Sequence, residues 1–264
     1  MAIRSIFWLL FFASILSAWS WLYFMAVSMD IDLIGRLGPD GQMMAAMNPN
    51  MEMDMPMTGW NMLFAMWAIM MAAMMLPVMV PTLTTYDSLI LSANGTRLTW
   101  FGIFVGYFII WIVFAAIIAI LQLVLLFSGL IDMYGIAKSP IFACGILTCV
   151  GLFQFSRTKQ VCHGICLSPL AYFMKNWVLG LFGGIRMGVG LGVYCVCCCW
   201  GFMMLGFVGG VMNLLWMGLA TIFMILEKIP QVGRALTKPL GFVLILGAVV
   251  LASDHYFGGT YKWR

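Results

Sequence analysis

The sequence predicts an all-α fold, namely a polytopic transmembrane helical bundle of about seven transmembrane helices. Hydrophobic residues make up 64% of the chain and charged residues only 8%, whereas a soluble domain carries about 25% charged residues. The mean hydropathy is +1.06. The apolar runs are long and do not alternate with polar residues, and inside lipid only helices or closed barrels satisfy every backbone hydrogen bond. We therefore expect one transmembrane domain over residues 1–264, with the lipid bilayer as its main partner and no nucleic acid.

Seven apolar runs define the expected helices, because one crossing takes roughly 20 residues. The first run is expected to be an uncleaved anchor, since it is too long for a signal peptide and lacks a small-residue cleavage site. The second starts at Trp60, and charged or polar segments bound the third and fourth clearly. The expected helices are residues 6–27, 60–81, 100–127, 139–155, 187–207, 211–226 and 239–253.

The fifth and sixth helices lie in one nearly uncharged stretch that must contain a turn. Gly209 and Gly210 predict that turn, and residues 177–184 are expected to form a short interfacial or re-entrant segment. Glycines at Gly184, Gly188 and Gly192 recur every four residues, which predicts a small-residue face for close helix packing. The doublet Glu227-Lys228, at the end of the sixth helix, is interpreted as an ion pair or a snorkelling anchor.

The distribution of positive charge predicts the orientation. With the N-terminus inside, nine of the thirteen Lys and Arg residues fall on the same side, as the positive-inside rule requires of the cytoplasmic face. Residues 28–59 then form an external Met-rich loop and residues 157–176 a cytoplasmic Cys/His loop. We expect a multi-pass protein of the bacterial inner membrane, with a cytoplasmic N-terminus and a periplasmic C-terminus.

Methionine is the first signal of chemistry, with 25 in the chain. Met66, Met70 and Met74 in the second helix recur every four residues, so their thioethers stack along one helical face. Soft thioether sulfur selects Cu(I), although methionine also serves as an adaptable apolar filler. The external loop adds methionines in an acidic segment where there is no core to fill, and we interpret them as copper-capture ligands. The candidates there are Met51, Met53, Met55 and Met57.

A cysteine cluster in the fifth helix is the second signal. Cys195, Cys198 and Cys199 share one helical face, while Cys197 is expected to point away. Three thiols on one face can bind Cu(I) or Zn(II) once deprotonated. The alternative is that these cysteines are small buried hydrophobes suited to tight packing.

The third signal is a Cys-X3-Cys sequence with an internal histidine in the segment 157–176. Its candidate ligands are Cys162, His163 and Cys166, and this arrangement is typical of half a metal site. Nearby Lys and Arg residues would favour thiolates over thiols. A reduced, merely structural segment is the alternative.

These motifs resemble a bacterial family known as predicted metal-binding integral membrane proteins. The resemblance runs over roughly residues 60–241 and is carried by residues 66–77, 192–200, 210–217 and 227–228. It implies that Cys162 with Cys166, and the cluster at 195–199, are metal ligands. The chain departs from the family at Leu191, where relatives usually have His, and at Cys197, where they usually have Gly. A lost imidazole and an added thiol favour Cu(I).

The leading hypothesis is a copper-binding membrane subunit of a larger complex, which holds or delivers Cu(I) for an oxidase or monooxygenase-type partner. With nearly all residues in apolar segments, the chain has little room for an aqueous active site of its own, so we expect a non-catalytic or accessory role beside other membrane subunits. Two alternatives stay open. One is a soft-metal transporter, supported by the stacked methionines, and the other is a purely structural accessory subunit.

Overall fold

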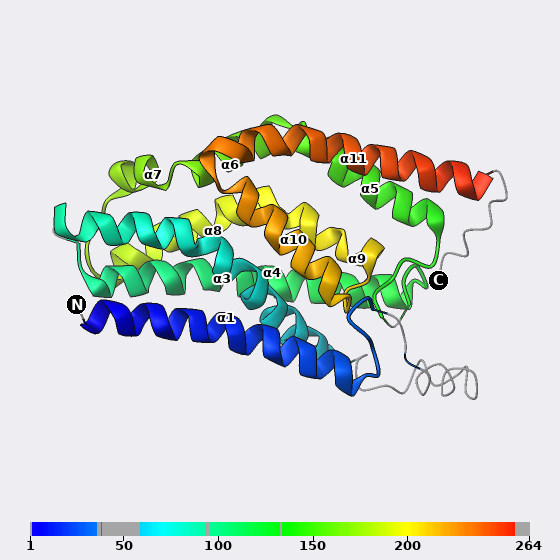
Figure 1. The fold of residues 1–264 in the computed structure, drawn as a ribbon, viewed down its shortest axis with the longest axis horizontal. Coiled ribbons are helices and arrows are strands. Elements are labelled where there is room, and N and C mark those ends of the chain that lie inside the picture. Colours follow the sequence, from blue (N-terminus) through cyan, green and yellow to red (C-terminus); the bar gives the residue numbers. More distant parts are fainter. Residues whose placement is uncertain (1, 36–37, 39–58, 93–94, 133, 257–264) are drawn as a thin grey trace.

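Long helices run side by side along the molecule (Figure 1). The computed structural model describes residues 2–35, 38, 59–92, 95–132 and 134–256. The helices are α1 (Ala2–Ser28), α3 (Trp60–Ser92), α4 (Arg97–Phe127), α5 (Pro140–Gln154), α6 (Arg157–Leu167), α7 (Pro169–Asn176), α8 (Gly180–Met204), α9 (Gly206–Gly209), α10 (Leu214–Glu227) and α11 (Pro230–Tyr256). In the described part of the chain, β-type pairing is limited to one isolated bridge between Ile131 and Ala137. The predicted all-α fold is confirmed.

The arrangement in Figure 1 places α1 along one edge of the bundle and the pair α5 and α11 along the opposite edge. Between these edges lie α3, α4, α8 and the obliquely running α10. Helices α4 and α8 make the most extensive contact, followed by α5 with α11. The interior therefore lies where α3, α4, α8 and α10 meet, and the candidate site is built on these central helices and on α6.

The predicted number of about seven spans can be compared with the lengths of the described helices. Within the described residues, five helices are long and apolar enough to cross a membrane, and α5 with α6 adds a sixth if this pair, bent by 62°, forms one span. All seven predicted segments are helical, but α10 has only 14 residues. At 1.5 Å per residue it is about 21 Å long, which is shorter than the roughly 30 Å hydrocarbon core.

Apolar side chains cover the outer faces of the long helices. Leu16 on α1 is 68% exposed and Ile117 on α4 is 56% exposed. Contiguous apolar surface of this kind is unfavourable in water and typical of contact with a membrane or another protein.

Two helices extend beyond their predicted bounds. Helix α3 continues past Pro81 to Ser92, and there the hydroxyls of Thr84 and Thr85 donate to the Pro81 carbonyl at 2.9 and 2.8 Å. Helix α8 begins at Gly180, whose N–H donates to Thr99 Oγ1 at 2.9 Å, so most of the segment 177–184 is regular helix and not a re-entrant segment. The predicted turn at 209–210 is correct, and Gly210 adopts a φ of +94° there.

The segment 157–176, which we expected to be a loop, forms helices α6 and α7 instead. Ser156 caps α6, because its hydroxyl accepts the Lys159 N–H at 3.1 Å. Ser168 separates the two helices, and α7 begins with Pro169 at a position where proline needs no hydrogen-bond partner. The polar residues of this segment suggested a loop, but they are part of these two helices.

Glycines bring α4 and α8 close enough for their backbones to touch, as the predicted small-residue face requires. A Cβ atom on Gly188 would collide with the backbone carbonyl of Ile103, and one on Gly184 with that of Thr99. From the other side, a Cβ on Gly106 would collide with the carbonyl of Ile185. The close approach is therefore reciprocal and leaves no space for a side chain.

Gly188→Ala is expected to destabilise the bundle by about 1–3 kcal/mol, the usual cost of overpacking a close-packed interior. The comparison is Gly145→Ala on α5, where a Cβ would meet no atom within 4 Å. Thermal unfolding midpoints in detergent measure the difference. Equal midpoints for the two variants would contradict the backbone contact between α4 and α8.

Candidate metal centre

Helix α6 carries several reactive side chains on one face. They recur at spacings of three and four residues, which places them on the same side of a helix. That face packs against α8. Three of these residues are buried and Cys166 is half-buried. They are Lys159, Cys162, His163 and Cys166.

Helix α8 presents the facing cysteines. Cys195 and Cys198 are each 2% exposed and Cys199 is fully buried, so the predicted shared face does point into the protein. The Tyr107 hydroxyl on α4 donates to Cys195 Sγ at 3.1 Å. The thiols of α8 thus lie between α6 on one side and α4 on the other.

Three thiols lie close enough together to share one ion. The Sγ atoms of Cys166, Cys195 and Cys198 are all within 4.8 Å of one another, and those of Cys166 and Cys198 are 3.9 Å apart. A metal–thiolate bond measures about 2.3 Å for zinc, so one ion binds two sulfurs that are up to about 4.6 Å apart. Only small movements would bring all three thiols, hereafter the thiol triad, onto one ion.

The other predicted cysteines lie next to the triad but outside it. Cys199 Sγ is 3.3 Å from Cys198 Sγ. Cys197 was expected to point away from the cluster, yet its Sγ lies 2.9 Å from that of Cys162 on α6. Its position on α8 directs it away from the triad, but α6 covers that side of α8 as well. Helices α6 and α8 therefore meet through two sets of thiols.

His163 holds α6 to the end of α10 and does not join the triad. Its Nε2 lies 2.7 Å from the backbone oxygen of Glu227. Since a carbonyl can only accept, Nε2 carries the proton and donates. The predicted ligand set Cys162, His163 and Cys166 is therefore divided in space, and Cys166 is its member in the triad.

Two lysines approach the thiols, and their ammonium groups have different partners. Lys159 Nζ pairs with Glu227 Oε2 at 2.9 Å and donates to the Cys198 backbone oxygen at 2.8 Å. Lys228 Nζ lies 3.6 Å from Cys195 Sγ and 3.8 Å from Cys198 Sγ. The doublet Glu227-Lys228 is thus neither an internal ion pair nor a snorkelling anchor, because both side chains are buried and each faces another group.

This arrangement places one uncompensated positive charge at the thiols. Lys159 and Glu227 neutralise each other, while Lys228 has only sulfur near its ammonium group among the contacts of the described residues. An unpaired buried charge is costly, and a thiolate would compensate it. Two thiolates, one Cu(I) and the Lys228 ammonium together carry no net charge. The centre is suited to a monovalent soft cation.

The sequence interpretation missed Lys159, Lys228 and Tyr107 as parts of the site. Both lysines were counted as charges on the cytoplasmic surface, but Lys159 is fully buried and Lys228 is 7% exposed. A signal was present for Lys159, which precedes Cys162, His163 and Cys166 by three, four and seven residues. That spacing is typical of one face of a helix, whereas a loop was expected for this segment. Nothing in the sequence pairs Tyr107 with Cys195.

The predicted methionine ligands of α3 lie inside the bundle. Met66, Met70 and Met74 are each at most 4% exposed. Met70 and Met74 line a common small cavity, but Met66 is not part of its lining. The predicted loop ligands Met51, Met53, Met55 and Met57 lie outside the described residues.

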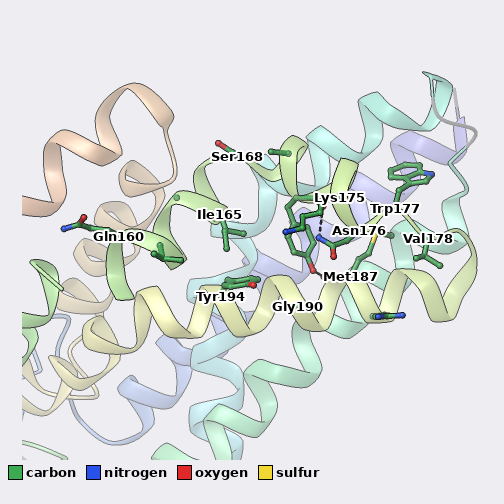
Figure 2. A pocket seen from close by; sticks show the side chains of 15 residues that line it. Gln160, Ile165, Ser168, Lys175, Asn176, Trp177, Val178, Met187, Gly190 and Tyr194 are labelled. Carbon is green, nitrogen blue, oxygen red and sulfur yellow. Dashed lines mark hydrogen bonds between the residues drawn. The ribbon is translucent and has the colours of Figure 1, made fainter. Parts of the chain in front are cut away.

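A larger cavity of about 820 Å³ lies beside the thiols, between α6 and α7 on one side and α8 on the other (Figure 2). Its lining includes Lys175 and Arg186, and Tyr172 spans it by donating to the Met187 carbonyl at 3.1 Å. None of the cysteines belongs to the lining. The cavity follows the face of α6 that carries Gln160 and Ile165, so it adjoins the metal centre without forming part of it.

An all-α bundle of apolar helices with mutually close, buried thiols defines a helical protein suited to a soft metal. The family model described as a copper chaperone, PpoB2, matches residues 64–251, a range that includes all eight cysteines. The chain therefore belongs to this copper chaperone family. No curated protein and no solved structure matches it significantly.

The family confirms the coarser part of the predicted resemblance, namely a metal-binding protein family. Copper, the predicted metal, is supported both by the family and by the thiol triad. Thiolates are soft ligands for Cu(I), zinc and iron–sulfur clusters, so the donor set is compatible with the copper that the family indicates.

Proposed function

We propose that this chain is a membrane-embedded copper chaperone that holds Cu(I) at Cys166, Cys195 and Cys198 and delivers it to a membrane oxidoreductase. The observation that carries the proposal is the thiol triad, with all three sulfurs within 4.8 Å of one another. The match to a copper chaperone family supports the identity of the cargo. The apolar, exposed helices support a position in the bilayer beside other membrane subunits.

The triad suits transfer as well as binding, because its members come from two elements. Cys195 and Cys198 lie on the long central helix α8, whereas Cys166 lies near the end of the short helix α6. Cys166 is also the member that is only half-buried. In the proposed handover an acceptor ligand binds Cu(I) as Cys166 releases it. Cu(I) stays monovalent throughout, and a proton returns to each thiolate that lets go.

Replacing Cys166, Cys195 and Cys198 together by Ser is expected to remove one tightly bound Cu(I) per chain. Serine keeps the size but replaces the soft sulfur with a hard oxygen. Elemental analysis after exposure to a Cu(I) chelator gives the stoichiometry, and X-ray absorption at the copper edge identifies the sulfur ligands in the parent protein.

The matched control is Cys149→Ser, which changes an exposed cysteine on α5 away from the cluster. Cys197→Ser is also expected to keep the ion, since Cys197 pairs with Cys162 and not with the triad. If the triple variant bound as much copper as the parent, the cysteines would have only a packing role and the protein would be better described as a structural accessory subunit.

A further inference from the structure

Four buried thioethers surround a second, smaller cavity in the centre of the bundle. Met70 and Met74 come from α3, Met203 from the end of α8 and Met217 from α10. Each of these side chains is at most 4% exposed. We name this space the methionine cavity. Three helices that are distant in sequence thus bring their sulfur-bearing residues to one place.

The size and lining of the methionine cavity suit a bare soft cation better than water. Its volume is about 10 Å³, which is space for about one small atom. A buried water needs 2–4 polar partners, and the side chains that line this cavity are apolar apart from their sulfurs and one indole N–H. Thioether sulfur is a ligand for Cu(I).

The indole of Trp216 closes one side of the methionine cavity, and Gly209 makes room for it. Trp216 lines the cavity, and its ring lies so close to Gly209 that a Cβ there would be 2.6 Å from a ring carbon. Gly209 therefore leaves the space that the ring occupies.

Gly206 keeps the methionine cavity open. It lines the cavity, yet a Cβ on Gly206 would meet no atom closer than 3.9 Å. Alanine would fit there and would favour the helix by about 1 kcal/mol over glycine. Filling this space would therefore not strain the surrounding structure.

The methionine cavity adjoins the thiol triad through Phe202. One side of Phe202 lines the cavity, while Lys159 Nζ, which bonds to the Cys198 carbonyl, lies 5.5 Å from the ring centroid. Along α8, Met203 follows Cys199 by one helical turn, a rise of about 6 Å. An ion in the cavity would be one short step from the thiols.

We propose that the methionine cavity is a second Cu(I) site that feeds the thiol triad. This proposal rests on the proposed function of the triad as the principal site. Thioethers are neutral, so an ion in the cavity keeps its full charge, whereas the triad with Lys228 neutralises it. The ion therefore binds more weakly among the methionines and moves toward the thiols. In that step Cu–thioether bonds break, two Cu–thiolate bonds form, and a proton leaves each thiol that becomes a thiolate, without any change in copper oxidation state.

The test is carried out in the full-length protein with the triad already replaced by Ser, which removes the proposed principal site and leaves the other five cysteines the same in every variant. Ag(I) is the probe, since it shares the charge and soft character of Cu(I) and is not readily oxidised. Two variants are compared in this background. One changes Met70, Met74, Met203 and Met217 to Leu, and the other is Gly206→Ala, which keeps every sulfur but fills the space. The control changes Met71 and Met75 to Leu, which are buried on α3 outside the cavity lining.

Both cavity variants are expected to bind one Ag(I) per chain fewer than the background protein, while the control binds the same amount. Because the comparison is a difference, silver bound by methionines elsewhere does not affect it. Equal binding in the background protein and Gly206→Ala, with the folded state verified by thermal unfolding, would overturn the proposal. The proposed role of the triad is measured separately, by the ion lost when its three cysteines are replaced in the parent protein.

Discussion

Lys159→Met is expected to destabilise the folded protein by about 3–5 kcal/mol, the usual cost of removing one partner from a buried ion pair. The side chains of Lys159 and Glu227 are 0% and 2% exposed, and their charged atoms are 2.9 Å apart. Without the ammonium group, the Glu227 carboxylate would stay buried without its counterion. The Cys198 carbonyl would also lose the donor that now bonds it.

Unfolding by denaturant in detergent measures this loss, and Lys238→Met is the control because Lys238 is exposed. A surface change of that kind is expected to cost less than about 0.5 kcal/mol. The double variant Lys159→Met with Glu227→Gln removes both charges and is expected to recover part of the loss, since no orphaned charge remains. A single variant as stable as the control would show that the pair does not hold α6 against α10.

The positions of the helices could be predicted from the sequence because helices that can cross a membrane need long apolar runs. All seven predicted segments are helical, and the turn at Gly210 is in the predicted place. The errors lie at the polar segments. Residues 157–167 are polar and basic, so they suggested a loop, but Lys159, Cys162 and His163 are buried within the bundle. An amphipathic helix can turn its polar face inward where that face lines a site in the protein interior.

Two members of the triad could be predicted from spacing alone, since Cys195 and Cys198 are one helical turn apart. Cys166 was a candidate as part of a different motif. Cys166 joins Cys195 and Cys198, while His163 does not, because of the angle at which α6 crosses α8. A local sequence pattern does not determine that angle. The same holds for Met203 and Met217, which meet Met70 and Met74 only through the packing of three helices.

The charged residues of the site were misinterpreted for a related reason. The positive-inside rule counts lysines by their position between apolar runs and assumes that they reach water. Lys159 and Lys228 satisfy the count but are buried, each beside an anion or a group that can become one. Buried ionisable residues between membrane helices are typical of functional sites.

Lys228→Met is expected to weaken Cu(I) binding by about 10²- to 10³-fold. A unit charge about 4 Å away contributes roughly 4 kcal/mol at an effective dielectric constant of 20, and relaxation of the protein removes part of this energy. Lys228 Nζ lies 3.6 and 3.8 Å from two thiol sulfurs. Without it, a Cu(I) bis-thiolate would leave a net negative charge buried among apolar helices.

Competition with a Cu(I) chelator measures the affinity of the Lys228 variants. Lys228→Arg keeps the charge and is expected to retain most of the affinity, and Lys175→Met, an exposed lysine on α7, is the control. Methionine fits a buried position and removes the uncompensated charge, so the copper-free protein should be at least as stable as the parent. If Lys228→Met and Lys228→Arg weakened binding equally, the effect would be one of shape, and the ammonium charge would not be what balances the thiolates.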